Sequence, residues 1–100
     1  SMGVMRATFV GANLSGADLS GANLFKADFS HADLTGARLT GANLENADLV
    51  DTDFGRADLT GARFAKSNIE GANFRGATGV SGIQGLDQAR NRDKALFDEK

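Results

Sequence analysis

Residues 16–44 have the sequence GADLSGANLFKADFSHADLTGARLTGANL, in which a leucine or phenylalanine returns at every fifth position. The same register continues in both directions without an insertion or a deletion. Fourteen consecutive units share it, so the five-residue unit is the building block of the fold. The central residues of these units, predicted to form the core, are Phe9, Leu14, Leu19, Leu24, Phe29, Leu34, Leu39, Leu44, Leu49, Phe54, Leu59, Phe64, Ile69 and Phe74.

The other positions of the unit are equally regular. The residue two before the centre is alanine in 12 of the 14 units, with Thr52 and Ser67 as exceptions. The residue just before the centre is asparagine or aspartate in 11 units, and glycine stands two after the centre in eight. The unit is therefore Ala-Asn/Asp-Leu/Phe-x-Gly.

A period of five fits neither an α-helix, with apolar spacings of three and four, nor a strand, with a spacing of two. It fits a chain that turns a corner once in each unit, so that four units close a square coil of about 20 residues and stacked coils pair as parallel strands about 4.8 Å apart. Alternation along each side points the alanine and the central residue inward and the Asn/Asp outward.

The corners require a residue with positive φ, which glycine supplies in the third position of a type II turn. Asn46 and Asp51 stand at this position and tolerate the conformation moderately well. For Lys26, Arg56 and Lys66 we expect a different turn type, because a long side chain disfavours positive φ.

The tandem pattern GANLSGADLSGANLFKADF, residues 11–29, resembles the pentapeptide-repeat family, and the resemblance covers residues 7 to about 78. It implies an all-β solenoid, a right-handed quadrilateral parallel β-helix. Fourteen units correspond to about three and a half coils.

Three segments are expected along the chain. Residues 1–3 resemble a tag remnant, residues 4–80 form the β-helix, and residues 81–100 form a C-terminal capping α-helix and tail. The helix is predicted from an apolar stripe of Leu86, Ala89, Leu96 and Phe97. The first coil, with Val4 in the central register, has no such cap, which suggests a homodimer through this end.

The composition narrows the function classes. There is no cysteine and therefore no thiolate metal site, and neither a metal nor a cofactor is expected. A net charge of -2 argues against nucleic-acid binding. The apolar runs are far shorter than the roughly 20 residues that cross a bilayer, so we expect a soluble, cytoplasmic protein.

Residues 20 apart stack on one face, which brings acidic side chains together. Asp28 and Asp48 share one face, and Asp33 and Asp53 share the next. Such carboxylates could bind a cation or mimic DNA phosphates, but hydrogen bonding to the local backbone is the favoured interpretation.

Two further sets of charged residues line up in the same way. His31 and Asp51 form the only pair that resembles an acid–base dyad, but no nucleophile or cleft accompanies them, so we expect no enzyme activity. Arg38, between Asp18 and Asp58, suggests an exposed ion-pair ladder. The neighbouring carboxylates oppose a phosphate-binding role for Arg38 and Arg63.

Phe25 stands at an outward position, as do Val10 and Val50, and exposed aromatic residues can anchor interfaces. These three residues are the predicted partner-binding residues. The resulting hypothesis is a non-catalytic scaffold for an unidentified protein partner. The alternative, implied by the family resemblance, is a DNA mimic that binds a type II topoisomerase, since some members protect DNA gyrase from quinolones.

Overall fold

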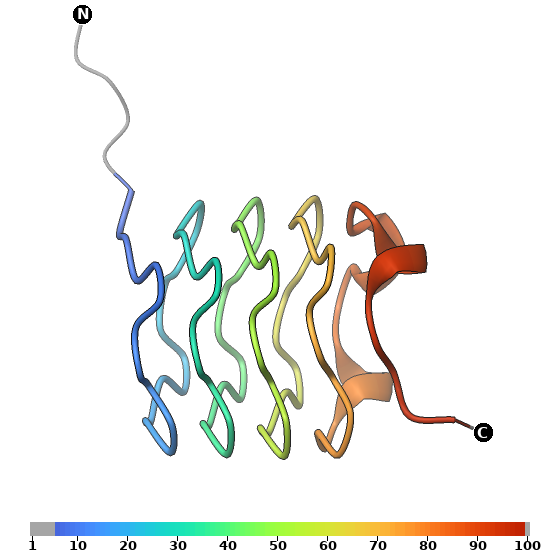
Figure 1. The fold of residues 1–100 in the computed structure, drawn as a ribbon, viewed down its shortest axis with the longest axis horizontal. Helices are drawn as coiled ribbons and strands as arrows, with labels where there is room; N and C mark the ends of the chain where they lie inside the picture. Colours follow the sequence, from blue (N-terminus) through green and yellow to red (C-terminus); the bar gives the residue numbers. More distant parts are fainter. Residues whose placement is uncertain (1–5, 100) are drawn as a thin grey trace, which may run out of the picture.

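The computed structural model describes residues 6–99, which wind into four-sided coils stacked along one axis (Figure 1). Parallel bridges join residues 20 apart, from Thr8 with Asp28 up to Asp58 with Thr78. Each side of a coil contributes an isolated bridge, and no longer strand is present within residues 6–99. The predicted stacking of residues 20 apart is confirmed.

Backbone hydrogen bonds hold each coil to the next. The Phe29 N–H donates to the Asp48 carbonyl at 2.8 Å, and the Asp48 N–H donates to the Ala27 carbonyl at 2.9 Å. The same pair of bonds recurs on the other sides of the coils. Proline lacks the N–H that this ladder requires, which explains its complete absence from the sequence.

The core lies on the axis of the coils, as predicted. Every central residue from Leu24 to Phe74 is buried, together with the alanines two residues before each centre from Ala27 to Ala72. The central residues of the first coil, Phe9, Leu14 and Leu19, are half-buried because only one described coil packs against them.

Thr52 and Ser67, which replace alanine at the inward position two residues before the centre, each form a side-chain hydrogen bond. The Thr52 hydroxyl donates to the Phe29 carbonyl at 2.8 Å, and the Ser67 hydroxyl donates to the Phe64 carbonyl at 2.7 Å. Both residues are fully buried, so these bonds avoid the cost of an unpaired polar group.

Aromatic rings stack from coil to coil in the interior. Phe9 lies on Phe29 with ring centroids 4.8 Å apart, and Phe54 lies on Phe74 at 5.1 Å. Phe97 continues the second stack beyond Phe74 at 5.0 Å. The first two stacks follow from the 20-residue spacing, whereas Phe97 lies outside the repeat register.

The expectation of a different turn type at Lys26, Arg56 and Lys66 is wrong. Their φ values are 62°, 57° and 63°, close to the 67–77° of the corner glycines. The N–H of the next residue closes each corner, as when the Ala57 N–H donates to the Phe54 carbonyl at 3.0 Å. In the five-residue coils the ladder is built with the same turn at these corners, and it imposes positive φ even on a long side chain.

The predicted C-terminal α-helix is also wrong. The segment instead contains three short 3-10 helices: η1 (Val80–Gly82), η2 (Leu86–Gln88) and η3 (Arg92–Lys94). Between them the chain still pairs with the coil below, through bridges of Arg63 with Gln84, Asn68 with Arg90 and Asn73 with Leu96. The last segment is therefore a further coil rather than a helix laid across the end.

This last coil has six residues per side instead of five. The paired residues Gln84, Arg90 and Leu96 are six apart, and each 3-10 helix follows a residue with positive φ, namely Gly79, Gly85 and Asn91. The extra residue is accommodated in the corner, so the paired sides are preserved. Leu96, expected in the apolar stripe, is 41% exposed on the outer face.

The predicted tag remnant, residues 1–3, and the predicted central residue Val4 lie outside the described residues. Within residues 6–99, the structure contains no helix with the length and apolar character needed to cross a membrane.

The corners give a paired test of backbone strain, because Arg56 and Gly36 occupy the same corner in successive coils and both have positive φ. Arg56→Gly should raise the free energy of unfolding by about 0.5–1 kcal/mol, since it relieves the left-handed strain. Gly36→Ala should lower it by about 1 kcal/mol although its Cβ would meet nothing within 4 Å. Urea denaturation measures both, and a stabilising Gly36→Ala would contradict the assignment.

Candidate functional site

Phe25 is the most prominent exposed aromatic side chain of the described chain, with 46% of its surface accessible. It occupies the second position of a corner turn, and Lys26 occupies the third, with its ammonium 5.5 Å from the ring centroid. The Phe25 N–H donates to the Asn23 side-chain oxygen at 3.3 Å. The corner therefore holds an aromatic ring outward on a backbone that is fixed by the ladder.

The ring borders one flat side of the solenoid, which we call the Asp28 face and define by Thr8, Asp28, Asp48 and Asn68. The corner on its other border carries Val10, which is 55% exposed. Val50 occupies the same corner two coils further on and is half-buried, so it exposes less apolar surface than Val10 does. Phe25 and Val10 thus lie on the two borders of one face.

The outward aspartates bond to their own turns. On the adjacent Asp33 face, defined by Asn13, Asp33, Asp53 and Asn73, the Asp33 carboxylate accepts bonds from the Thr35 hydroxyl at 2.6 Å and the Thr35 N–H at 2.9 Å. Asp28, Asp48 and Asp53 likewise accept a bond from the backbone N–H two residues later. These local hydrogen bonds account for aspartate at the outward positions. Within residues 6–99 there is no group of three side chains that could hold a metal ion.

These bonds stabilise the charged form of several carboxylates. The pKa of Asp18, Asp33 and Asp58 is lowered, first by the hydroxyl of the residue two later and then by its N–H. These three carboxylates are therefore held in the charged form at neutral pH.

The His31–Asp51 pair forms as the 20-residue spacing predicts. The His31 Nδ1 lies 3.5 Å from the Asp51 Oδ2, and both side chains are half or more exposed. Both residues have positive φ at one corner, and the Asp51 carboxylate packs over Gly71. This is a surface contact at a convex corner and not a site where a substrate is enclosed.

The predicted ladder through Arg38 forms as backbone pairing only. Arg38 bridges to Asp18 and Asp58, but its guanidinium is in none of the ion pairs between described residues. Arg63 instead pairs with Glu45 at 3.2 Å, and Arg6 pairs with Asp28 at 3.6 Å. The spacing of 20 does not predict these two pairs, because their partners occupy different positions of the unit.

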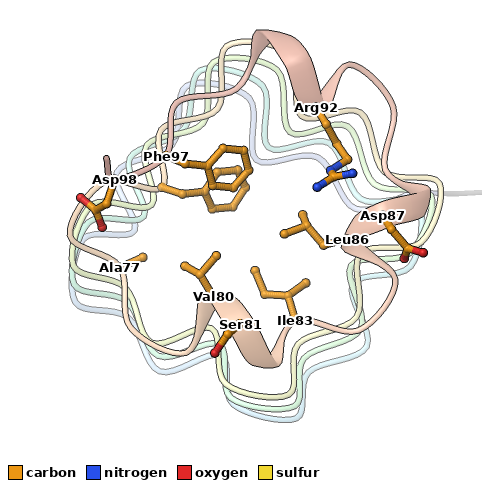
Figure 2. A pocket seen from close by; sticks show the side chains of 10 residues that line it. Ala77, Val80, Ser81, Ile83, Leu86, Asp87, Arg92, Phe97 and Asp98 are labelled. Carbon is orange, nitrogen blue, oxygen red and sulfur yellow. The ribbon is translucent and has the colours of Figure 1, made fainter. Parts of the chain in front are cut away.

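A cavity at the C-terminal end was not predicted either. The inner walls of the last coil surround a volume of about 520 Å³, open at the end of the solenoid (Figure 2). Its apolar lining residues are Phe74, Ala77, Val80, Ile83, Leu86 and Phe97, and Ser81, Asp87, Arg92 and Asp98 complete it. The missed signal is the six-residue spacing of Gly79, Gly85 and Asn91.

The comparison with protein-family models identifies the class. Residues 5–41 and 37–76 match the pentapeptide repeats, which are counted in eight copies. The chain therefore belongs to the pentapeptide-repeat family. The square coils are the right-handed quadrilateral β-helix of this family, whose members are generally non-catalytic.

The solved structure of one relative agrees with this class. A pentapeptide repeat protein (Rfr23) from the cyanobacterium Cyanothece 51142 is 28% identical, with a TM-score of 0.82 over 93% of this chain and 62% of that protein. The protein alr5209 from Nostoc Pcc 7120 is also 28% identical, with a TM-score of 0.47 over 93% of this chain and 86% of that one. Compared with Rfr23, the chain spans less than two thirds of the relative's length.

QnrB1, a plasmid-mediated fluoroquinolone resistance protein, is 18% identical, with a TM-score of 0.43 over 95% of this chain and 64% of that one. A similarity at this level carries no argument about function. No curated protein matches the chain.

The pKa of Asp33 gives a direct test of the local hydrogen bonds. In Thr35→Val the hydroxyl donor is lost, so the pKa of Asp33 should rise towards its ordinary value. A lowered pKa in the folded state stabilises the protein above about pH 4, and this contribution is lost as the pH falls through the folded value. The variant should therefore lose less stability on acidification.

Carbon-detected NMR titration measures the pKa, and Asp58, which keeps its Thr60 donor, is the internal control. An unchanged pKa of Asp33 in Thr35→Val would contradict the assignment.

Proposed function

We propose that this chain is a non-catalytic scaffold that binds a protein partner across the Asp28 face. The observation that supports the proposal most directly is the pair of exposed apolar side chains on its borders, Phe25 and Val10. Exposed aromatic residues are enriched among the residues that contribute most to binding free energy.

The backbone beneath this surface is already ordered. Phe25 and Val10 lie in turns whose residues are hydrogen-bonded to the next coil, as in the bond from the Lys26 N–H to the Glu45 carbonyl at 3.0 Å. A partner therefore meets a preformed surface, and little conformational entropy is lost on binding.

The charges of the face indicate the kind of partner. Asp28 and Asp48 lie between the two apolar borders, and Asp51 lies beside Val50 at one corner. Arg6 pairs with Asp28 at 3.6 Å, and Lys26 lies at the Phe25 border, so the basic groups lie at the edge of this face and the carboxylates lie inside it. A partner with an apolar anchor flanked by lysine or arginine would be complementary in both respects.

Capture of partners from a lysate by the wild type and by Phe25→Ala tests this proposal. The variant should retain less than about a tenth of the partner, because a buried aromatic anchor contributes about 2 kcal/mol or more. Leu96→Ala is the matched control, since Leu96 is 41% exposed but lies at the opposite end.

If Phe25→Ala and the wild type recover the same partners in the same amounts, the Asp28 face is not the binding surface. Light scattering on the purified wild type and on Phe25→Ala shows whether the partner is a second copy of the chain. A dimer that persists in Phe25→Ala would support the predicted homodimer through the first coil, where Phe9, Leu14 and Leu19 are half-buried.

A second candidate function, a DNA mimic that binds a type II topoisomerase, is favoured by one observation. Asp28 and Asp48 are bridged neighbours, as are Asp33 and Asp53, so two adjacent faces carry carboxylates about one strand spacing apart. Two observations oppose this function: asparagines occupy other positions of both faces, and the net charge of the chain is only -2.

The scaffold proposal predicts that DNA supercoiling by gyrase is unchanged when the protein is added. Inhibition of supercoiling, or protection of gyrase from a quinolone, would instead support the DNA mimic. In that case the double variant Asp33→Asn and Asp53→Asn should abolish the effect, because it removes the charge and retains the shape.

A further inference from the structure

The cavity at the C-terminal end, which we call the C-terminal mouth, results from the change of unit length. Its walls include Val80 and Leu86, the first residues of η1 and η2, both only half-buried (Figure 2). The volume of about 520 Å³ lies within the roughly 300–1,000 Å³ of pockets for small ligands.

An aromatic stack ends at this cavity. Phe54, Phe74 and Phe97 lie nearly parallel, with interplanar angles of 9° and 5° and centroid distances of 5.1 and 5.0 Å. Phe97 is the last ring of the stack and lines the mouth. A flat aromatic ring seated on Phe97 would therefore extend a stack whose spacing and orientation are already set.

Arg92 occupies an unusual position for a cation. It is the first residue of η3 and so corresponds to Val80 in η1 and Leu86 in η2, which are apolar. Its guanidinium points into the mouth (Figure 2) and is in none of the ion pairs between residues 6 and 99.

The two carboxylates at the rim do not neutralise this cation. Asp87 and Asp98 point outward, away from the opening (Figure 2). Asp98 also accepts bonds from the Gly76 N–H at 3.1 Å. An apolar cavity with an aromatic wall thus contains one cation that points inward.

We propose that the C-terminal mouth binds a small planar aromatic carboxylate. The ring would stack on Phe97 and face Val80 and Leu86 across the mouth, and the carboxylate would accept two parallel hydrogen bonds from the neighbouring Arg92 (Figure 2). An uncharged ligand leaves Arg92 without a partner, and a cationic ligand is repelled by it.

A second copy fits this end less well than a small molecule does. A second copy would have to match a last coil whose sides are six residues apart and whose corners η1, η2 and η3 are helical turns, unlike the five-residue coils of the rest of the chain (Figure 1). The site is also independent of the Asp28 face, so failure of either proposal leaves the other intact.

Titration of the 15N-labelled protein with 2-naphthoate tests the site. Amide signals of residues 85–97 should shift in a saturable way, while those of the first coil should not. The neutral 2-naphthamide and the non-aromatic decanoate should each bind at least about threefold more weakly, because each lacks one of the two predicted interactions.

Arg92→Gln should weaken 2-naphthoate binding about threefold to tenfold and leave 2-naphthamide binding unchanged. Lys94→Gln, which removes the same charge from the same 3-10 helix outside the lining, should change neither. Phe97→Leu keeps an apolar side chain and should weaken both aromatic probes about twofold to tenfold.

Thermal unfolding confirms that each variant is folded. Absence of saturable shifts at the mouth, equal affinity for naphthoate and naphthamide, or an unaffected Arg92→Gln variant would each overturn the proposal. Concentration-dependent dimerisation that occludes the mouth and prevents probe binding would do the same.

Discussion

Backbone hydrogen bonding between successive coils is the constraint on which the other features of this solenoid depend. Each side of a coil both donates to and accepts from the side stacked on it, as when the Phe29 N–H donates to the Asp48 carbonyl and the Asp48 N–H donates to the Ala27 carbonyl. In the five-residue coils these bonds hold the sides to one length and the corners to one shape, and the six-residue coil keeps the paired sides and changes only its corners. The positive φ of Lys26, His31 and Arg56 shows that the ladder outweighs the conformational preference of single residues, a cost of about 1–2 kcal/mol each.

The interior and the surface both follow from this constraint. Equal sides leave a narrow axis that is filled by alternating small and large side chains, and the buried hydroxyls of Thr52 and Ser67 are accepted because each reaches a carbonyl. Outside, the aspartates bond to their own turns and present charge in regular columns. Features that depart from the repeat are therefore the most informative about function: Phe25 at a corner and Arg92 in the C-terminal mouth.

The periodicity of the sequence was sufficient to predict the coils, the stacking of Phe9 on Phe29 and the contact of His31 with Asp51, because a fixed spacing of 20 determines which residues are neighbours. Two features could not be predicted from the periodicity. The conformation of Lys26, Arg56 and Lys66 depends on pairing with the next coil and not on local preference. The C-terminal segment has apolar spacings that also suit a helix, so its assignment required the positive φ at Gly79, Gly85 and Asn91.

The most direct measurement is a set of backbone nuclear Overhauser effects between successive coils in solution. The account predicts contacts between residues 20 apart up to Asp58 and Thr78, and then separations of 21, 22 and 23 for Arg63 with Gln84, Asn68 with Arg90, and Asn73 with Leu96. A continuous series of helical contacts three and four residues apart over 86–97, or no contacts between Asn43 and Arg63, would contradict it.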